Sequence, residues 1–346
     1  LLSPNINNLL FLTFFINVIA AVNNYPDLLR ASVATYENDF RLGGHEAPPA
    51  IISVYIGEEL LSILDDICES GELLNFNINE KLKILNIENI IKDNTDRNRT
   101  SPFAFTGNKF EFRSPGSSLN CSKSMTVLNL IVADQLFRFK NDVEILIKER
   151  QHALDSQPDF KIIFDNSDIV LDVLKTYLEE SRRIVFNGDN YSQDWIKETT
   201  EQMGLRNITN SLEAYKEYIT PEVIELYEKN KILTKNELIA RYDLKVDKYV
   251  KKLKIEARIL EDIISNTIIY NIDKLNENLL FNHKGMISNI LDLIKNLNSS
   301  IDTKDFTYSI ECMNLIRDII NKVEKYSFDE DWRFPKMYEI FYMNYH

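Results

Sequence analysis

The stretch that most constrains the fold alternates charged and aromatic residues after a glycine-asparagine pair. Residues 102–113 read "PFAFTGNKFEFR", with Gly107-Asn108 between two short runs. A two-residue link of this kind is typical of a β-hairpin. Because successive side chains of a strand point to opposite faces, the sequence predicts one aromatic and one charged face. The aromatic side chains are Phe110 and Phe112, and the charged ones are Lys109, Glu111 and Arg113.

Composition narrows the class of protein. The chain has 346 residues, of which 44% are hydrophobic, and a net charge of -13. This length is enough for two packed domains. Its lysines and arginines are scattered among acids, which argues against nucleic acid as a partner. Cys68, Cys121 and Cys312 form no short-spaced pair, so the sequence predicts neither a zinc site nor a disulfide framework, and a reducing cytoplasm is the expected location.

The most apolar segment lies near the amino terminus. Residues 9–22 read "LLFLTFFINVIAAV", and the segment has no basic region before it and is shorter than the roughly 20 apolar residues that span a bilayer. We therefore expect a buried helix and no membrane partner. Since the chain begins with Leu1 and not methionine, we expect it to start inside a domain.

Most of the remaining pattern is helical. Helices are expected from residue 1 to about 36 and from about 50 to 68. Further along, Pro221 is a favourable helix start, and "TKNE" at 234–237 is a capping box that opens another helix. A long helix follows, with a narrow apolar stripe typical of a packed core. The stripe consists of Val246, Val250, Leu253, Ala257, Leu260 and Ile264.

Two further segments carry residues suited to phosphate chemistry. "RLGGHEAPP" contains Arg41 and Glu46, and its prolines exclude the helix that an HExxH zinc site needs. "DRNR" contains Arg97 and Arg99. If these segments lie beside the hairpin, arginines and carboxylates gather as a nucleotide-metal site requires. A merely solvated charged surface explains the same residues equally well.

Longer segments resemble a known family. "NDFRLGGHEAPPAIISVYIGEEL" (38–60) and "DRNRTSPFAFTGNKFEFRSPGSS" (96–118) resemble two segments of type III glutamine synthetases, in the same order and at the same separation. "YPDLLRAS" (25–32), "IVFNGDNYSQDW" (184–195) and "DWRFPKMYEIFY" also resemble parts of that family. The resemblance covers nearly the whole chain.

The resemblance implies a fold and an activity. The fold class is α+β: residues 1–218 would form the carboxyl-terminal part of the catalytic domain, an antiparallel sheet with helices, and residues 219–346 a mainly helical domain. The activity implied is that of a glutamate-ammonia ligase, which uses ATP and Mg²⁺ or Mn²⁺ to join ammonium to L-glutamate through γ-glutamyl phosphate. A cytoplasmic homo-oligomer, a dodecamer of stacked rings, is also implied.

The resemblance also implies a role for each site residue. Glu111 matches a metal ligand, and Lys109 matches a nucleotide-contacting position. Arg99 and Arg113 match residues that stabilise charge on the transferring phosphoryl group and bind the substrate. Arg41 matches the arginine that binds the glutamate carboxylate, and Glu46 matches a flap carboxylate that accepts a proton from ammonium.

Some features depart from the family pattern. Phe40 occupies the position where type III relatives usually carry histidine, and this chain has "GGHEAPP" where they commonly have "GANEAPP". The family's amino-terminal β domain and its other metal ligands have no match here, so we expect the 346 residues by themselves to bind ATP and Mg²⁺ weakly and to form no glutamine. Two alternatives stay open: a γ-glutamyl ligase that uses another amine, and a helical assembly module without catalysis.

Overall fold

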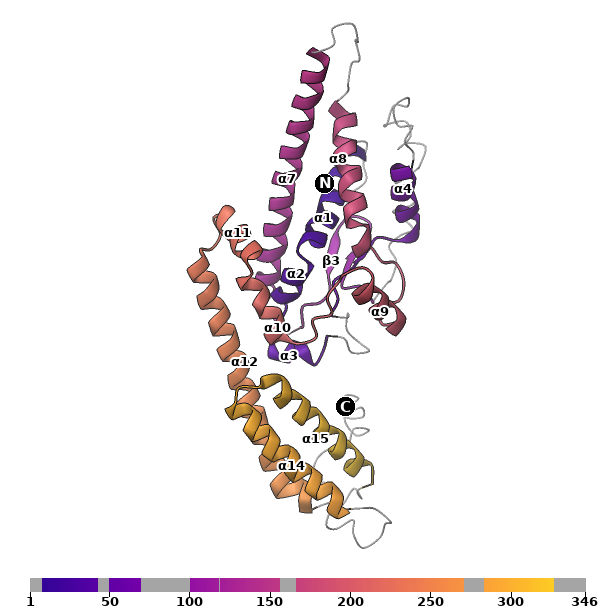
Figure 1. Cartoon of the computed structure of the whole chain (residues 1–346). Helices are drawn as coiled ribbons and strands as arrows, with labels where there is room; N and C mark the ends of the chain where they lie inside the picture. The colour runs from indigo at the N-terminus through magenta and orange to yellow at the C-terminus, as the bar shows by residue number, and fades with distance from the viewer. Residues whose placement is uncertain are drawn as a thin grey trace, which may run out of the picture. The chain divides into compact units, whose positions relative to one another are not determined.

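The computed structural model describes residues 8–42, 50–69, 100–117, 119–155, 166–270 and 283–326. The chain divides into two compact units, Leu1–Lys245 and Val246–His346. Figure 1 shows the elements of both. This division describes packing, and the expected family domain boundary near residue 219 stays a prediction.

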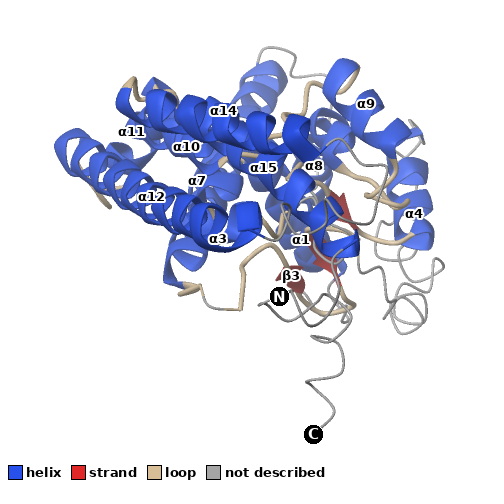
Figure 2. Ribbon diagram, turned by 90° about the horizontal axis from the view of Figure 1, so that it is seen from below, coloured by secondary structure: helices blue, strands red, loops and turns tan. Residues whose placement is uncertain are grey.

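The first unit combines helices with a small sheet (Figure 2). Its elements, in chain order, are α1 (Asn8–Asn24), α2 (Pro26–Ser32), α3 (Tyr36–Asp39), β1 (Val54–Tyr55), α4 (Glu58–Glu69), β2 (Phe103–Phe105), β3 (Phe110–Phe112), α7 (Ser122–Asp155), α8 (Asn166–Ser181), the 3-10 turn η2 (Arg182–Ile184), α9 (Gln193–Glu201), α10 (Ser211–Tyr215), the 3-10 turn η3 (Lys216–Ile219) and α11 (Pro221–Lys229). Helix α12 (Lys235–Ile263) begins in this unit and continues into the second.

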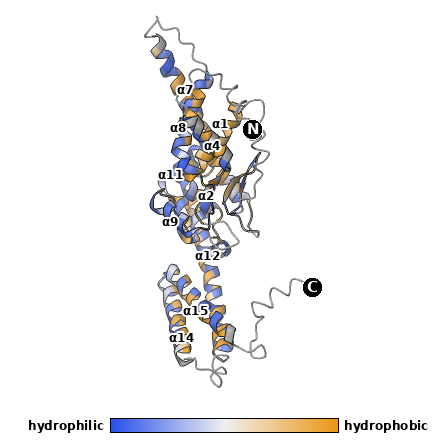
Figure 3. Ribbon diagram, turned by 90° about the vertical axis from the view of Figure 1, so that its right-hand side faces the viewer, coloured by the Kyte–Doolittle hydropathy of each residue, from blue (hydrophilic) through white to orange (hydrophobic). Residues whose placement is uncertain are grey.

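Helix α1 is the buried helix that residues 9–22 predict. Phe15, Ile19 and Val22 on it are fully buried, and α1 packs against α7 and α8. Apolar residues of α1 appear orange in Figure 3. No single helix among the described residues is long and apolar enough to cross a membrane; α1 and α2 pass the length and composition test only as a pair bent by 80°.

The described sheet corrects part of the predicted architecture. Its strand order is β1-β2-β3, with β2 and β3 antiparallel, as expected, but β1 and β2 parallel. The sheet is therefore mixed. Because residues 54–55 belong to strand β1, helix α4 starts at Glu58 and not near residue 50.

The elements described in the second unit are all helices. It contains the remainder of α12, a π-helical turn (Ile264–Ile268), α14 (His283–Asp302) and α15 (Phe306–Tyr326). Leu253, Ala257 and Ile264 of the predicted stripe are buried. Ala257 and Ile264 lie in one core cluster with apolar residues of α14 and α15, helices that carry both apolar and polar residues in Figure 3. Amphipathic helices bury one such stripe each.

Candidate active site

The hairpin predicted from the alternating sequence is present. Strands β2 and β3 pair with Ala104 opposite Glu111, and the turn is closed by a hydrogen bond from the Thr106 amide to the Lys109 carbonyl at 2.9 Å. Gly107 has φ of 94°, a left-handed conformation that glycine adopts without steric cost. The turn therefore sets the register that separates charged from aromatic side chains.

The aromatic face of the hairpin packs on α1. The ring of Phe110 stacks on Phe15 of α1 at 5.4 Å between centroids and on Phe103 of β2 at 5.1 Å. Phe15 also meets Phe105 edge to face at 4.9 Å. Aromatic pairs in these arrangements add to the free energy of burial. This packing holds the sheet on α1 with its charged residues turned away from the helix.

The charged face places one carboxylate between two cations. A carboxylate oxygen of Glu111 lies 3.4 Å from the Lys109 ammonium, and the other lies 3.4 Å from the Arg113 guanidinium. The exposed fractions of the side chains fall from 63% for Lys109 through 39% for Glu111 to 23% for Arg113. The three groups are thus adjacent and accessible, which suits contact with a ligand that carries both negative charge and a metal ion.

Arg41 lies at the carboxyl end of β3. Its guanidinium donates to the carbonyl of Ser114 at 2.8 Å and to that of Arg113 at 3.3 Å. The neighbouring Asn38 amide also donates to the Ser114 carbonyl, at 3.2 Å. The segment that carries Arg41 therefore lies against the end of the hairpin, as it must if both segments contribute to one site.

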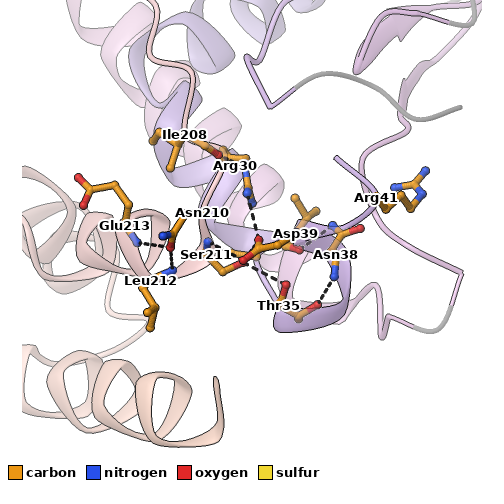
Figure 4. A network of polar contacts seen from close by, with 12 residues as sticks. Arg30, Thr35, Asn38, Asp39, Arg41, Ile208, Asn210, Ser211, Leu212 and Glu213 are labelled. Carbon is orange, nitrogen blue, oxygen red and sulfur yellow. Dashed lines mark hydrogen bonds and ion pairs between the residues drawn. The ribbon is translucent and has the colours of Figure 1, made fainter. Parts of the chain in front are cut away.

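A buried polar network holds the Arg41 segment in place (Figure 4). Arg30 of α2 is 1% exposed, donates to the carbonyl of Ile208 at 2.8 Å, and has a guanidinium nitrogen 3.6 Å from the Asp39 carboxylate. Asp39 in turn accepts hydrogen bonds from the amide and hydroxyl of Ser211. Sequence reasoning missed this network, because an arginine within a short helix carries no signal of burial.

The "NGDN" segment secures the other edge of the sheet. Its Asn187 side chain accepts from the amides of Ile56 and Gly57 at 3.1 and 3.2 Å. The Asn190 amide donates to the hydroxyl of Ser53 at 2.6 Å. These contacts fix β1 and the start of α4, so the segment is a structural support of the sheet. Its glycine and asparagines are the only sequence signal for this role.

The described residues place one carboxylate, that of Glu111, on the charged face of the hairpin. Among them, no group of three or more histidine, cysteine, aspartate or glutamate side chains is arranged to hold a metal ion. Glu111 is the carboxylate on the charged face, and Mg²⁺ commonly takes one or two protein carboxylates and fills its other positions with phosphate and water. The described residues therefore fit one ligand of a metal and do not by themselves form a complete site.

The structure brings together four of the six predicted site residues. Lys109, Glu111 and Arg113 share one face, and Arg41 lies against the end of their strand. The other two, Glu46 and Arg99, lie outside the described residues, as does Arg97.

Comparison with known proteins identifies relatives over nearly all of the chain. The family model of the glutamine synthetase C-terminal domain matches residues 169–286. A glutamine synthetase of Bacteroides fragilis is 39% identical over 266 residues, which cover 76% of this chain and 35% of the relative. A type-3 glutamine synthetase of Dictyostelium discoideum is 33% identical over an alignment covering 97% of this chain and 49% of the relative.

A third relative has the same name. A glutamine synthetase of Butyrivibrio fibrisolvens is 32% identical, with 98% of this chain and 44% of the relative covered. The chain thus spans less than half the length of each of these three proteins. Over nearly its whole length the chain is similar to glutamine synthetases, and its residues 169–286 match the C-terminal domain of that family.

Proposed function

We propose that this chain serves glutamine synthesis, the ATP-dependent ligation of ammonia to the γ-carboxyl group of L-glutamate. In this reaction the γ-phosphoryl group of ATP moves to the carboxylate, which gives γ-glutamyl phosphate and ADP. The nitrogen of ammonia then attacks the acyl carbon, and phosphate leaves. The observation that carries the proposal is the Lys109–Glu111–Arg113 face, to whose strand end Arg41 is bonded.

Each group on this face has a proposed role in the transfer. Glu111 would provide one ligand of Mg²⁺ or Mn²⁺, which when bound neutralises charge on the phosphate oxygens. Arg113 would stabilise the charge that develops on the transferring phosphoryl group, and Lys109 would contact the nucleotide. The ion pairs of Glu111 with Lys109 and Arg113 support these roles, since they place the three groups close enough together to act on one bound phosphate group.

The substrate side of the site rests on the remaining predicted residues. The Arg41 guanidinium donates to two backbone carbonyls, and its remaining N–H groups would bind the glutamate carboxylate. Arg99 would bind both substrate and phosphoryl group, and Glu46 would accept the proton that ammonium loses. We also propose a cytoplasmic homo-oligomer of stacked rings, a dodecamer, that has no nucleic-acid or membrane partner.

Glu111→Gln tests the proposal, because it removes the charge and keeps the shape. We expect the chain to bind ATP weakly and in a Mg²⁺-dependent manner, measured by titration with and without Mg²⁺ at fixed ionic strength. In Glu111→Gln the Mg²⁺-dependent part of the affinity should fall at least about tenfold, about 1.4 kcal/mol. In an assembly that forms glutamine, the same change should lower turnover by orders of magnitude.

The matched control is Glu149→Gln, which removes an exposed carboxylate of α7 away from the hairpin. Nucleotide affinity should stay unchanged in this variant. Equal losses in both variants, or Mg²⁺-dependent binding that Glu111→Gln leaves intact, would contradict the assignment of Glu111 as a metal ligand. Absence of ATP binding at millimolar concentrations would contradict a nucleotide site on this chain.

A further inference from the structure

Helix α12 carries a second, exposed stripe on the side opposite its core residues. We call it the basic face: Lys248, Lys251, Lys252, Ile255, Arg258 and Ile259. Their spacing places them on one side of a helix. Ile255 is 57% exposed and Ile259 is 52% exposed, whereas Leu253 and Ala257 on the other side are buried. The described part of the chain therefore leaves two isoleucines, flanked by cations, exposed on this face.

A groove of complementary character lies between α11 and α12 of the first unit. It has a volume of about 850 Å³, and its residues include Ile219, Ile224, Glu225, Ile239, Tyr242 and Asp243, which we call the acidic groove. The isoleucines and the tyrosine ring provide apolar surface, and the two carboxylates stand beside it. Such grooves receive helices that present apolar residues at i and i+4 spacing.

The charges of the groove favour a cationic occupant. Neither Glu225 nor Asp243 has an ion-pair partner among the described residues. Of the lysines that line the groove, Lys229 is already paired with Asp134 at 2.8 Å. Glu228 adds a third carboxylate and also accepts from the Lys235 amide at 2.8 Å. The groove lining thus carries three carboxylates against two lysines, Lys229 and Lys235, which leaves an excess of negative charge beside apolar surface.

We propose that the basic face of one chain docks into the acidic groove of a second copy. The inference rests on the proposed homo-oligomer and names a contact within it. Charge complementarity selects this occupant: in a chain of net charge -13, residues 248–258 carry five cations and one acid, and the groove provides the opposite sign. The isoleucine pair supplies the apolar surface that the groove accepts. A contact between two different surfaces can repeat from copy to copy. It forms a closed ring when the rotation that relates neighbouring copies divides a full turn evenly.

Charge reversal on each side tests the contact. The face variant is Lys248→Glu with Arg258→Glu, and the groove variant is Glu225→Lys with Asp243→Lys. We chose these side chains because no described residue pairs with them, so reversal breaks no internal ion pair. Either variant should weaken self-association at least about tenfold in sedimentation experiments on the full chain, since like charges then face each other.

Mixing the two variants distinguishes docking from a general effect of charge. In a mixture, the reversed face of the face variant meets the reversed groove of the groove variant, so their charges are again opposite. The two variants should therefore associate with each other, measured by energy transfer between two labelled chains. The matched control, Lys295→Glu with Arg317→Glu, makes the same charge change on exposed positions of α14 and α15 and should associate like the unaltered chain.

Several results would overturn the inference. These are a monomeric unaltered chain at tens of micromolar, variants that associate normally, or a mixture of folded variants that fails to associate. Binding of the unaltered chain to phosphatidylserine vesicles, lost only in the face variant and without self-association, would assign the face to a lipid surface instead. Because nucleotide binding is measured separately, its failure with association intact would count against the proposed function and leave this contact standing.

Discussion

Lys245 of α12 lies over two aromatic rings in the interior of the first unit. Its Nζ is 4.2 Å from the ring centroid of Tyr218 and 5.0 Å from that of Tyr215. No hydrogen-bond acceptor among the described residues reaches this nitrogen. Burial, together with the charges of Lys123 and Arg241, lowers the pKa of Lys245 to about 7. The folded protein therefore holds this amine partly neutral near neutral pH.

The lowered pKa predicts how stability varies with pH. Between about pH 7 and 10 the unfolded chain binds more protons at Lys245 than the folded chain, so the free energy of unfolding should rise with pH. Above about pH 10 the trend should reverse, because burial raises the pKa of Tyr227 to about 12 and that of Tyr218 well above its usual value. Urea denaturation at a series of pH values measures both limbs.

The control for this prediction is Lys245→Met, which keeps most of the length of the side chain and removes the amine. This variant should be more stable at pH 7 and should lose most of the rise between pH 7 and 10. A rise of equal slope in the variant would show that another group titrates.

At the scale of elements, the junction of β1 and α4 depends on a side chain that is distant in sequence. Asn187→Ala removes the oxygen that accepts from the amides of Ile56 and Gly57. Both residues are buried, so two N–H groups lose their partner, and the free energy of unfolding should fall by about 1–3 kcal/mol. Hydrogen exchange at Ile56 and Gly57 should accelerate, which locates the effect at this junction.

Two further variants isolate the role of the acceptor. Asn187→Asp keeps an oxygen at the start of a helix and should retain most of the stability. Asn141→Ala, on an exposed position of α7, should change the free energy of unfolding by less than about 0.5 kcal/mol. Equal losses for the alanine and aspartate variants at position 187 would refute the acceptor role.

At the scale of the whole molecule, Arg30 joins three separate segments of the first unit. It connects α2 to the Ile208 carbonyl and to Asp39, which binds Ser211. Arg30→Met should lower the stability of this unit by about 3–5 kcal/mol, because it leaves the nearly buried Asp39 carboxylate without its cation. Arg182→Met breaks an exposed pair with Asp65 at 3.2 Å and should cost less than about 1 kcal/mol.

The second unit provides an internal reference for that experiment. Cys312 is fully buried in its core, and its thiol reacts only when this unit opens. With Cys68 and Cys121 replaced by serine, thiol labelling should proceed at the same rate in Arg30→Met as in the parent chain. Faster labelling would show that the two units unfold as one.

Local patterns were sufficient for the features that depend on neighbouring residues. The hairpin followed from alternation and a Gly-Asn turn, which act over a few positions. The capping box at the start of α12 is present as predicted: Glu237 accepts from the Thr234 amide at 2.8 Å, and the Thr234 hydroxyl accepts from the Glu237 amide. The separation of charged from aromatic side chains on β3, which underlies the candidate site, was predictable for the same reason.

What the sequence by itself determined about this protein is its helical pattern, its hairpin, the charged face and the resemblance to its family. The tertiary structure decided which distant segments meet. Strand β1 has only two residues, too few for a periodic signal, and exists because it pairs with β2. The burial of Arg30 and the contact of Arg41 with the end of β3 likewise depend on contacts between segments far apart in the chain, and no local pattern encodes such contacts.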